Sequence, residues 1–281
     1  MTVLTIPFLP LEGDHQPPTF GTGSFKSRPI LPSQAWLQGD TAHYTWSDIW
    51  LTNHIVQAVI AAALVIGFWV WMARRQQVVP TKRQFVGEYL YDMLRNSIAR
   101  DILGPEYRRF LPYLVAIFSF ILVNNLFGQT FVFMFPTFSK VGFPYALALL
   151  SWLVYNGAGI VKHGFVGYFR HILIPAGVPW PLLVLIMPLE FLSNVITRPV
   201  TLALRLFANL FAGHLVIIVF VVGGEYLLLY SRPLLNHVAG VVALLFSFAI
   251  FALELLVGAL QAYIFTVLSA QYVSSAIAEE H

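Results

Sequence analysis

The chain has 281 residues, of which 58% are hydrophobic and 10% are charged. Soluble domains usually carry about 25% charged residues, so this composition indicates an integral membrane protein and excludes an ordinary soluble domain. The net charge is +3, and the basic residues lie in short loops beside apolar runs, which argues against nucleic-acid binding. The chain has no cysteine, which excludes disulfides and thiolate metal sites.

The first 47 residues are predicted to be a polar segment outside the membrane, because Pro, Gly and Ser are frequent there and no apolar period is visible. No signal peptide is predicted, since no basic region precedes the short apolar start. Residues 48–281 are predicted to form a single membrane domain. Its first spanning helix is expected at about Ile49 to Met72, before Arg74 and Arg75.

An amphipathic segment follows from Gln84 to Arg109, where charged residues recur among apolar ones. This pattern is typical of a helix that lies in the membrane interface. The second and third spans are predicted at about Phe110 to Phe135 and Pro144 to Val161. Residues 174–188 are apolar but interrupted by prolines, so we expect an interfacial or re-entrant connection there.

Two long apolar segments close the chain, from Glu190 to about Val222 and from about Pro233 to Val273, on either side of GGEYLLLYSRP. Helices of about 33 and about 40 residues would be roughly 50 and 60 Å long, against a hydrocarbon core of about 30 Å. We therefore predict an all-α fold with five transmembrane helices and one interfacial helix, the last two forming a steeply tilted hairpin. Breaks at Pro199, Gly240 or Gly258 are the alternative.

Five spans place the two termini on opposite sides of the membrane. Ten basic residues are expected on one side and four on the other: Arg74, Arg75, Lys82, Arg83, Arg95, Arg100, Arg108, Arg109, Lys162 and Arg170, against Lys26, Arg28, Lys140 and Arg232. By the positive-inside rule, the N-terminus is predicted outside and the C-terminus in the cytoplasm.

Polar residues inside the fourth span are the most informative feature of the sequence. A charged side chain at the bilayer centre costs about 2.5 to 3.5 kcal/mol and normally has a partner or a water-filled path. At about 100° per residue, Arg198 and Arg205 lie on one face with Asn209 nearby, whereas His214 points about 180° away from Arg205. Arg205 suits a fixed positive charge, because a guanidinium does not release its proton.

The last span carries a second polar stripe. Glu254 and Gln261 are seven residues apart and share a face, with Ser247 and Tyr272 close to it. Glu254 and His214 are able to exchange protons if they pair, which suits a relay. The structural alternatives are an interhelical arginine, a packing histidine and amides that hydrogen-bond between helices.

Three segments resemble the a subunit of F-type ATP synthases. They are RPVTLALRLFANLFAGHL (198–215), ELLVGALQAYIFTVLSAQY (254–272) and the asparagine pair of FILVNNLFG (120–128). The resemblance implies a stator protein with two offset half-channels that deliver protons to and from the carboxylates of a rotating c-ring. Arg205 would face the ring and separate the channels. Asn209, His214, Glu254 and Gln261 would line the outer half-channel.

The same resemblance implies an inner half-channel near Glu190, Arg198 and Tyr272, although the spacing from Glu190 to Arg198 is one residue longer than the usual pattern. Many bacterial members carry glutamate where this chain has His214 and histidine where it has Glu254. The exchange suggests that the two side chains are partners across the hairpin, as their positions on the two helices also suggest.

The implied function is proton translocation coupled to ATP synthesis, by a subunit with no catalysis of its own and no cofactor or metal. The implied partners are the c-ring, the peripheral-stalk b subunits, the remainder of the synthase and the lipid bilayer. The expected location is a bacterial plasma (inner) membrane, with the mitochondrial inner membrane as the alternative. A standalone proton channel, a secondary transporter, a structural subunit of a respiratory complex and a sodium-coupled synthase are the rival interpretations.

Overall fold

The computed structural model describes residues 52–74, 82–130, 137–174, 180–230 and 233–278. Their helices, in chain order, are α3 (Asn53–Ala73), α4 (Lys82–Leu94), η3 (Arg95–Arg100), α5 (Asp101–Leu103), η4 (Gly104–Glu106), α6 (Tyr107–Gly128), η5 (Thr137–Ser139), α7 (Gly142–His163), α8 (Phe165–Leu173), α9 (Trp180–Leu192), η6 (Ser193–Thr197), α10 (Arg198–Leu229) and α11 (Leu234–Ile277). The predicted segment 1–47 lies outside the described residues.

Five helical stretches in the described part are long and apolar enough to cross a membrane: Asn53–Ala73, Gln84–Gly128, Gly142–His163, Leu182–Leu229 and Leu234–Ile277. This confirms the all-α class and the five predicted spans. The predicted interfacial helix corresponds to α4, η3 and α5. It ends at Gly104 rather than Arg109, because Gly104 has a φ of 59° and turns the chain into α6.

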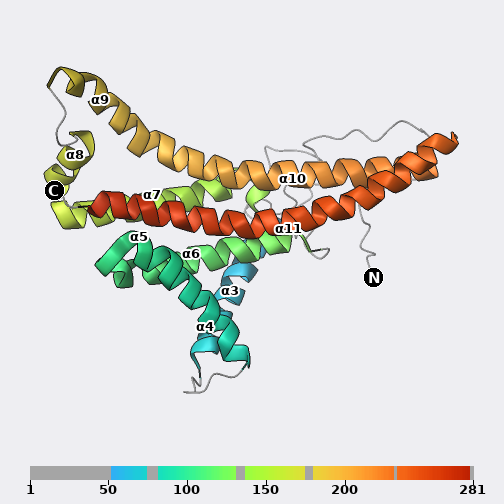
Figure 1. Ribbon diagram of the computed structural model, residues 1–281, viewed down its shortest axis with the longest axis horizontal. Helices are drawn as coiled ribbons and strands as arrows, with labels where there is room; N and C mark the ends of the chain where they lie inside the picture. Colours follow the sequence, from blue (N-terminus) through green and yellow to red (C-terminus); the bar gives the residue numbers. More distant parts are fainter. Residues whose placement is uncertain (1–51, 75–81, 131–136, 175–179, 231–232, 279–281) are drawn as a thin grey trace, which may run out of the picture.

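The closing hairpin dominates the molecule. Helices α10 and α11 pack against each other along the long axis, with α6 and α7 beside them (Figure 1). With 32 and 44 residues, they would be about 48 and about 66 Å long at 1.5 Å per residue. Both exceed a hydrocarbon core of about 30 Å, so they cross it aslant. Gly240 and Gly258 lie inside the continuous α11 and do not break it.

Two predicted connections are helical over the parts that the structure describes, which leave out residues 175–179 and 231–232. The stretch expected to connect the third and fourth spans is helical from Trp180 and runs through η6 into α10. Pro188 removes one backbone hydrogen bond from α9 without ending it, and Pro199 occupies the first turn of α10, where proline is tolerated. The segment GGEYLLLYSRP, expected to separate the last two spans, also stays helical as far as Leu229. Each of its two glycines costs a helix only about 1 kcal/mol.

A close approach of backbones explains why glycines occupy this end of the hairpin. A Cβ added to Gly224 would lie 3.1 Å from the Gly240 carbonyl oxygen, and one added to Gly240 would lie 2.9 Å from the Gly224 carbonyl oxygen. Small residues let membrane helices pack this closely. The two glycines therefore hold α10 and α11 together near their turn.

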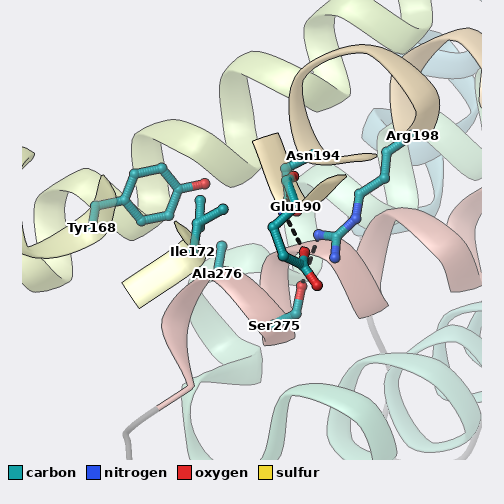
Figure 2. Close-up of a pocket in the computed structure, with 7 residues that line it drawn as sticks. All are labelled: Tyr168, Ile172, Glu190, Asn194, Arg198, Ser275 and Ala276. Carbon is teal, nitrogen blue, oxygen red and sulfur yellow. Dashed lines mark hydrogen bonds between the residues drawn. The ribbon is translucent and has the colours of Figure 1, made fainter. Parts of the chain in front are cut away.

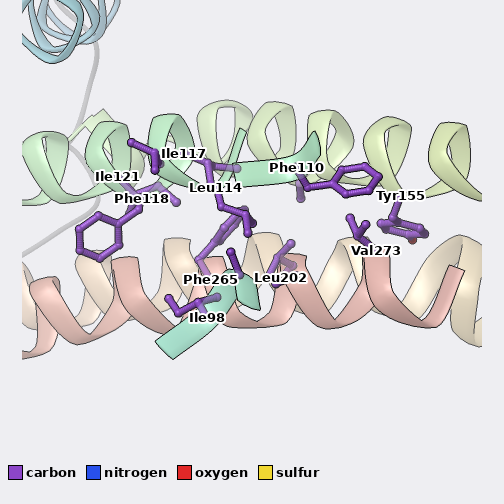
Figure 3. Packing of buried hydrophobic residues seen from close by; sticks show 14 of the residues in the cluster. Ile98, Phe110, Leu114, Ile117, Phe118, Ile121, Tyr155, Leu202, Phe265 and Val273 are labelled. Carbon is purple, nitrogen blue, oxygen red and sulfur yellow. The ribbon is translucent and has the colours of Figure 1, made fainter. Parts of the chain in front are cut away.

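The buried apolar core lies where α6, α7, α10 and α11 meet. Figure 3 shows its large members, among them Leu114, Tyr155, Leu202 and Phe265, each less than 3% exposed. Because lipid is as apolar as these side chains, tight packing rather than exclusion from water holds such helices together. This core fixes the rotation of α10, and so decides which of its polar residues face inward.

Candidate functional site

Arg205 lies on a face of α10 that no other described helix covers. Its exposed neighbours are Leu204, Ala208 and Ala212, spaced as on one side of a helix. Among the described residues, no hydrogen bond or ion pair engages the Arg205 guanidinium. A permanent charge on an apolar helix face needs a partner in a membrane. The arrangement therefore leaves Arg205 available to an acidic group on another chain.

His214 lies on the opposite side of α10 and is buried, as its position relative to Arg205 predicted. Its Nε2 atom is 2.8 Å from the Gly128 carbonyl oxygen at the end of α6. Its Nδ1 atom is 3.8 Å from Oε2 of Glu254 on α11, and Gln129 Nε2 donates to the same oxygen at 2.8 Å. Three helices thus converge on one carboxylate.

The contact with Gly128 defines what the histidine is able to do. A carbonyl oxygen only accepts hydrogen bonds, so Nε2 of His214 carries a proton and donates it. In the neutral ring Nδ1 is then unprotonated and faces the Glu254 carboxyl group. A transferable proton is therefore bound either to Nδ1 of His214 or to the carboxyl group of Glu254. The gap of 3.8 Å is longer than a direct hydrogen bond, so the two groups must move closer before a proton passes directly between them.

Two close contacts hold Glu254 in place. Asn125 Nδ2 donates to the Gly258 carbonyl oxygen at 2.7 Å, one turn beyond Glu254, and so ties α6 to α11. The carboxylate itself lies against the backbone of Gly213, where a Cβ atom would overlap it. Close packing at Gly213 is what lets the carboxylate reach His214.

Asn209 and Gln261 do not join this cluster. Gln261 is 5% exposed, and no described residue hydrogen-bonds its Nε2 atom. It follows Glu254 by seven residues, which is about 10 Å along a helix. Asn209 is half-buried, one turn beyond Arg205 and between the exposed and buried faces of α10.

A cavity of about 190 Å³ lies at the other end of the hairpin (Figure 2). Residues of α8, α9, η6, α10 and α11 line it: Tyr168, Ile172, Glu190, Asn194, Arg198, Ser275 and Ala276. It brings together two predicted inner half-channel residues, Glu190 and Arg198. The third, Tyr272, lies behind the lining, with the Arg198 guanidinium 5.2 Å from its ring centroid.

Hydrogen bonds fix the acidic and basic groups of this cavity. Asn194 Nδ2 donates to the Glu190 carboxylate at 3.2 Å and to the Glu190 carbonyl at 2.9 Å. Arg198 donates to Ser275 Oγ at 3.3 Å. Despite their seven-residue spacing, Arg198 and Arg205 therefore have different surroundings, the first against α11 and the second exposed.

The π-helical turn η6 accounts for the unusual spacing between Glu190 and Arg198. A π-turn inserts one residue into an α-helix and is frequent at functional sites. Here it lies between the two residues, and Tyr155 of α7 donates from its hydroxyl to the Asn194 carbonyl oxygen at 2.8 Å. The additional residue is absorbed in this turn, and both side chains still reach the cavity.

Tyr168 closes one side of the cavity from α8, outside the spanning helices. Its hydroxyl donates to Asn156 Oδ1 at 2.9 Å. Burial raises the pKa of Tyr168 to about 12, against a smaller opposing effect of the Arg198 charge. The phenol therefore stays neutral at physiological pH and acts as a hydrogen-bond donor rather than as a proton carrier.

Gln129 and Asn194 belong to these two sites but were not predicted from the sequence. Gln129 follows Asn125 by four residues, so it continues the polar face of that helix just beyond the apolar span. Asn194 lies four residues from both Glu190 and Arg198, a spacing that marks helix neighbours. Both signals are visible in the sequence, but only the fold assigns them partners.

Comparison with known proteins identifies the family. Residues 55–274 match the family model of the ATP synthase A chain. The chain is 50% identical over 231 residues to the ATP synthase subunit a of Nocardioides sp., covering 82% of this chain and 83% of that protein. It is 40% identical to that of Pseudarthrobacter chlorophenolicus over 82% and 86%, and 34% identical to that of Streptomyces lividans over 84% and 83%. The chain therefore belongs to the ATP synthase a-subunit family.

Proposed function

We propose that this chain passes protons between two half-channels and a ring of c subunits, with Arg205 as the charge that keeps the channels apart. Family membership makes the chain a proton-translocating component of the membrane sector and does not favour a standalone transporter or a respiratory subunit. One observation carries the proposal. An unpaired, exposed Arg205 and a buried His214–Glu254 pair occupy opposite sides of one helix.

On the outer side, a proton reaches the pair of His214 and Glu254 and passes to a deprotonated carboxylate of the ring. We assign Gln261, buried on α11, and Asn209, at the edge of the exposed face of α10, to this path, because their amides are suited to hold water. The neutral ring site then turns into the lipid. The fixed charge of Arg205 blocks a direct hop between the channels, because a guanidinium neither accepts nor releases protons at working pH.

On the inner side, the ring site loses its proton into the cavity of Glu190 and Arg198, with Tyr272 beneath the guanidinium. The carboxylate of Glu190 is suited to accept a proton, and the fixed hydrogen bonds from Asn194 keep it aimed at the cavity. Each proton that crosses 100 mV releases about 2.3 kcal/mol, so several must combine to drive the formation of one ATP. The chain is not catalytic on its own.

The proposed partners follow from the surfaces. On the uncovered face, the small residues Ala208 and Ala212 lie beside Arg205 and would let the helices of a ring approach closely. The rest of the F-type synthase is the partner that family membership implies, and we assign the peripheral-stalk b subunits to the stator side. We place the chain in a bacterial plasma membrane, with the N-terminus outside and the C-terminus in the cytoplasm.

Cysteine cross-linking tests which face of α10 meets the ring. Since the chain has no cysteine, Ala208→Cys introduces a single thiol beside Arg205, and a second thiol is placed next to the ring carboxylate. We expect rapid disulfide formation in the assembled enzyme. Ala203→Cys is the control, because Ala203 is fully buried on the other side of the helix. Cross-linking from Ala203 but not from Ala208 would overturn the proposed interface.

A further inference from the structure

A second buried polar cluster lies at the start of α3, away from the residues assigned above. His54 and Gln57 are 1% and 2% exposed, on the same face as the buried Ala61 and Val65. Neither ring nitrogen of His54 has a hydrogen-bond partner among the described residues, and neither has Nε2 of Gln57. Buried polar groups are rarely left in this condition.

The short helix η5 packs against α3 and carries a further polar group of this kind. Thr137 in η5 is fully buried, and its hydroxyl is also without a partner within the described part of the chain. Helix η5 packs against α3, α6 and α10 at once. It therefore connects α3 with α6, whose last residue directly precedes Gln129, and with α10, which carries His214.

Further buried polar atoms without a hydrogen-bond partner lie near the pair of His214 and Glu254. The side-chain oxygens of Asn124 and Asn125, near the end of α6, are buried and unpartnered, and so is Nδ1 of His214. Asn125 and the pair are tied together through α11 by the contact with Gly258. Polar atoms in need of partners thus extend over adjoining elements from α3 to α10.

We propose that His54, Gln57 and Thr137 bind a group of water molecules through which protons reach His214 and Glu254. The amide and hydroxyl groups donate, and each neutral histidine ring both donates and accepts, which are the contacts that water satisfies. A metal cation fits poorly, because the set holds no carboxylate and the ammonium of Lys140 follows η5 directly. The binding of water does not depend on the proposed function of the chain, whereas the delivery of protons rests on it.

Thiol accessibility tests the water-binding part without reference to proton transport. His54→Cys and Gln57→Cys are made singly in the assembled enzyme and exposed to silver ions, which reach thiols through water. The protein is then denatured and labelled with a fluorescent maleimide. We expect at least ten-fold less labelling for both variants after silver treatment. Ala61→Cys, on the same buried face but among apolar side chains, is expected to keep its labelling.

Full labelling of both variants after silver treatment would overturn the proposal, and so would equal protection of Ala61→Cys, which would indicate general access along α3. Using two positions keeps the test decisive if one variant fails to assemble.

Proton delivery is tested with Thr137→Val, which removes only the hydroxyl, and with His54→Leu and His54→Asn. In vesicles stripped of the soluble sector, we expect passive proton flux through the membrane sector to fall several-fold in Thr137→Val and His54→Leu, and to recover partly in His54→Asn. Unchanged flux in a silver-accessible protein would refute delivery alone. Failure of the proposed function has a different signature, namely normal pumping by a variant that lacks Arg205.

Discussion

The carboxylate of Glu254 lies against the backbone of Gly213, directly before His214 on the neighbouring helix, at a place where any Cβ atom would overlap it. The absence of a side chain at Gly213 therefore sets the distance between Glu254 and His214. Adding one methyl group at Gly213 therefore tests whether the distance between Glu254 and His214 matters.

Gly213→Ala is expected to displace Glu254 from His214 and to reduce ATP-driven proton pumping in inverted vesicles about ten-fold or more, since small misplacements in a reacting pair have effects of this size. Gly223→Ala is the matched control, because a Cβ atom there meets nothing within 4 Å on the same helix. Both changes raise helix propensity equally. Equal pumping by the two variants would refute the positional role of Gly213.

Exchanging the two members of the pair tests whether they act together. His214→Glu and Glu254→His are each expected to lower pumping strongly, because each single change leaves two like groups facing one another. The double variant again places one histidine opposite one carboxylate, as in the native pair. We expect it to recover more activity than the product of the single effects predicts, which is the mark of coupled residues. Strict additivity would count against a shared proton.

Gly240→Val tests the close approach at the turn of the hairpin. Its side chain would meet the Gly224 carbonyl oxygen and Leu228, so α10 and α11 must separate. Overpacking of this kind typically costs about 1 to 3 kcal/mol. We expect the assembled enzyme to lose activity at a lower temperature. Gly223→Val, at an open position of the same hairpin, is expected to keep the thermal profile, because valine has a higher helix propensity than glycine.

Glu190→Gln tests the inner cavity. The amide keeps the size of the side chain but cannot carry a proton, so passive proton flux is expected to fall several-fold. Glu106→Gln is a control of the same chemistry, because Glu106 pairs with Lys162 at 3.0 Å and does not line the cavity. A fall in flux for Glu106→Gln alone would remove the cavity from the proton path.

The sequence predicted the parts of this fold that depend on repeated patterns. The lengths of the apolar segments predicted five spans, which the structure has. Helical spacing predicted that Arg205 and His214 lie on opposite sides of one helix, as they do in the structure. Spacing cannot reveal contacts between helices, so the bond from Gln129 to Glu254 was missed. For the same reason the burial of His54 was not predicted, since it depends on η5 packing against α3.

The errors at the ends of the fourth span have a local cause. Prolines and paired glycines predict helix breaks, as is usual in short soluble helices. Here Pro188 lies inside α9, Pro199 lies in the first turn of α10, which follows the π-turn η6 directly, and Gly224 lies inside α10. Within a membrane, an unpaired backbone group costs several kcal/mol, so a helix continues through residues that would otherwise end it.

A single substitution tests the proposed role of Arg205 as the charge between the two half-channels. Wild type and Arg205→Ala are compared in inverted vesicles that contain the assembled enzyme, with ATP-driven proton pumping and passive proton leak recorded on the same samples. We expect Arg205→Ala to lose ATP-driven proton pumping while the enzyme stays assembled. We also expect its passive proton leak to increase, because the charge barrier between the channels is gone. Pumping near the wild-type level, with unchanged leak, would contradict this role of Arg205.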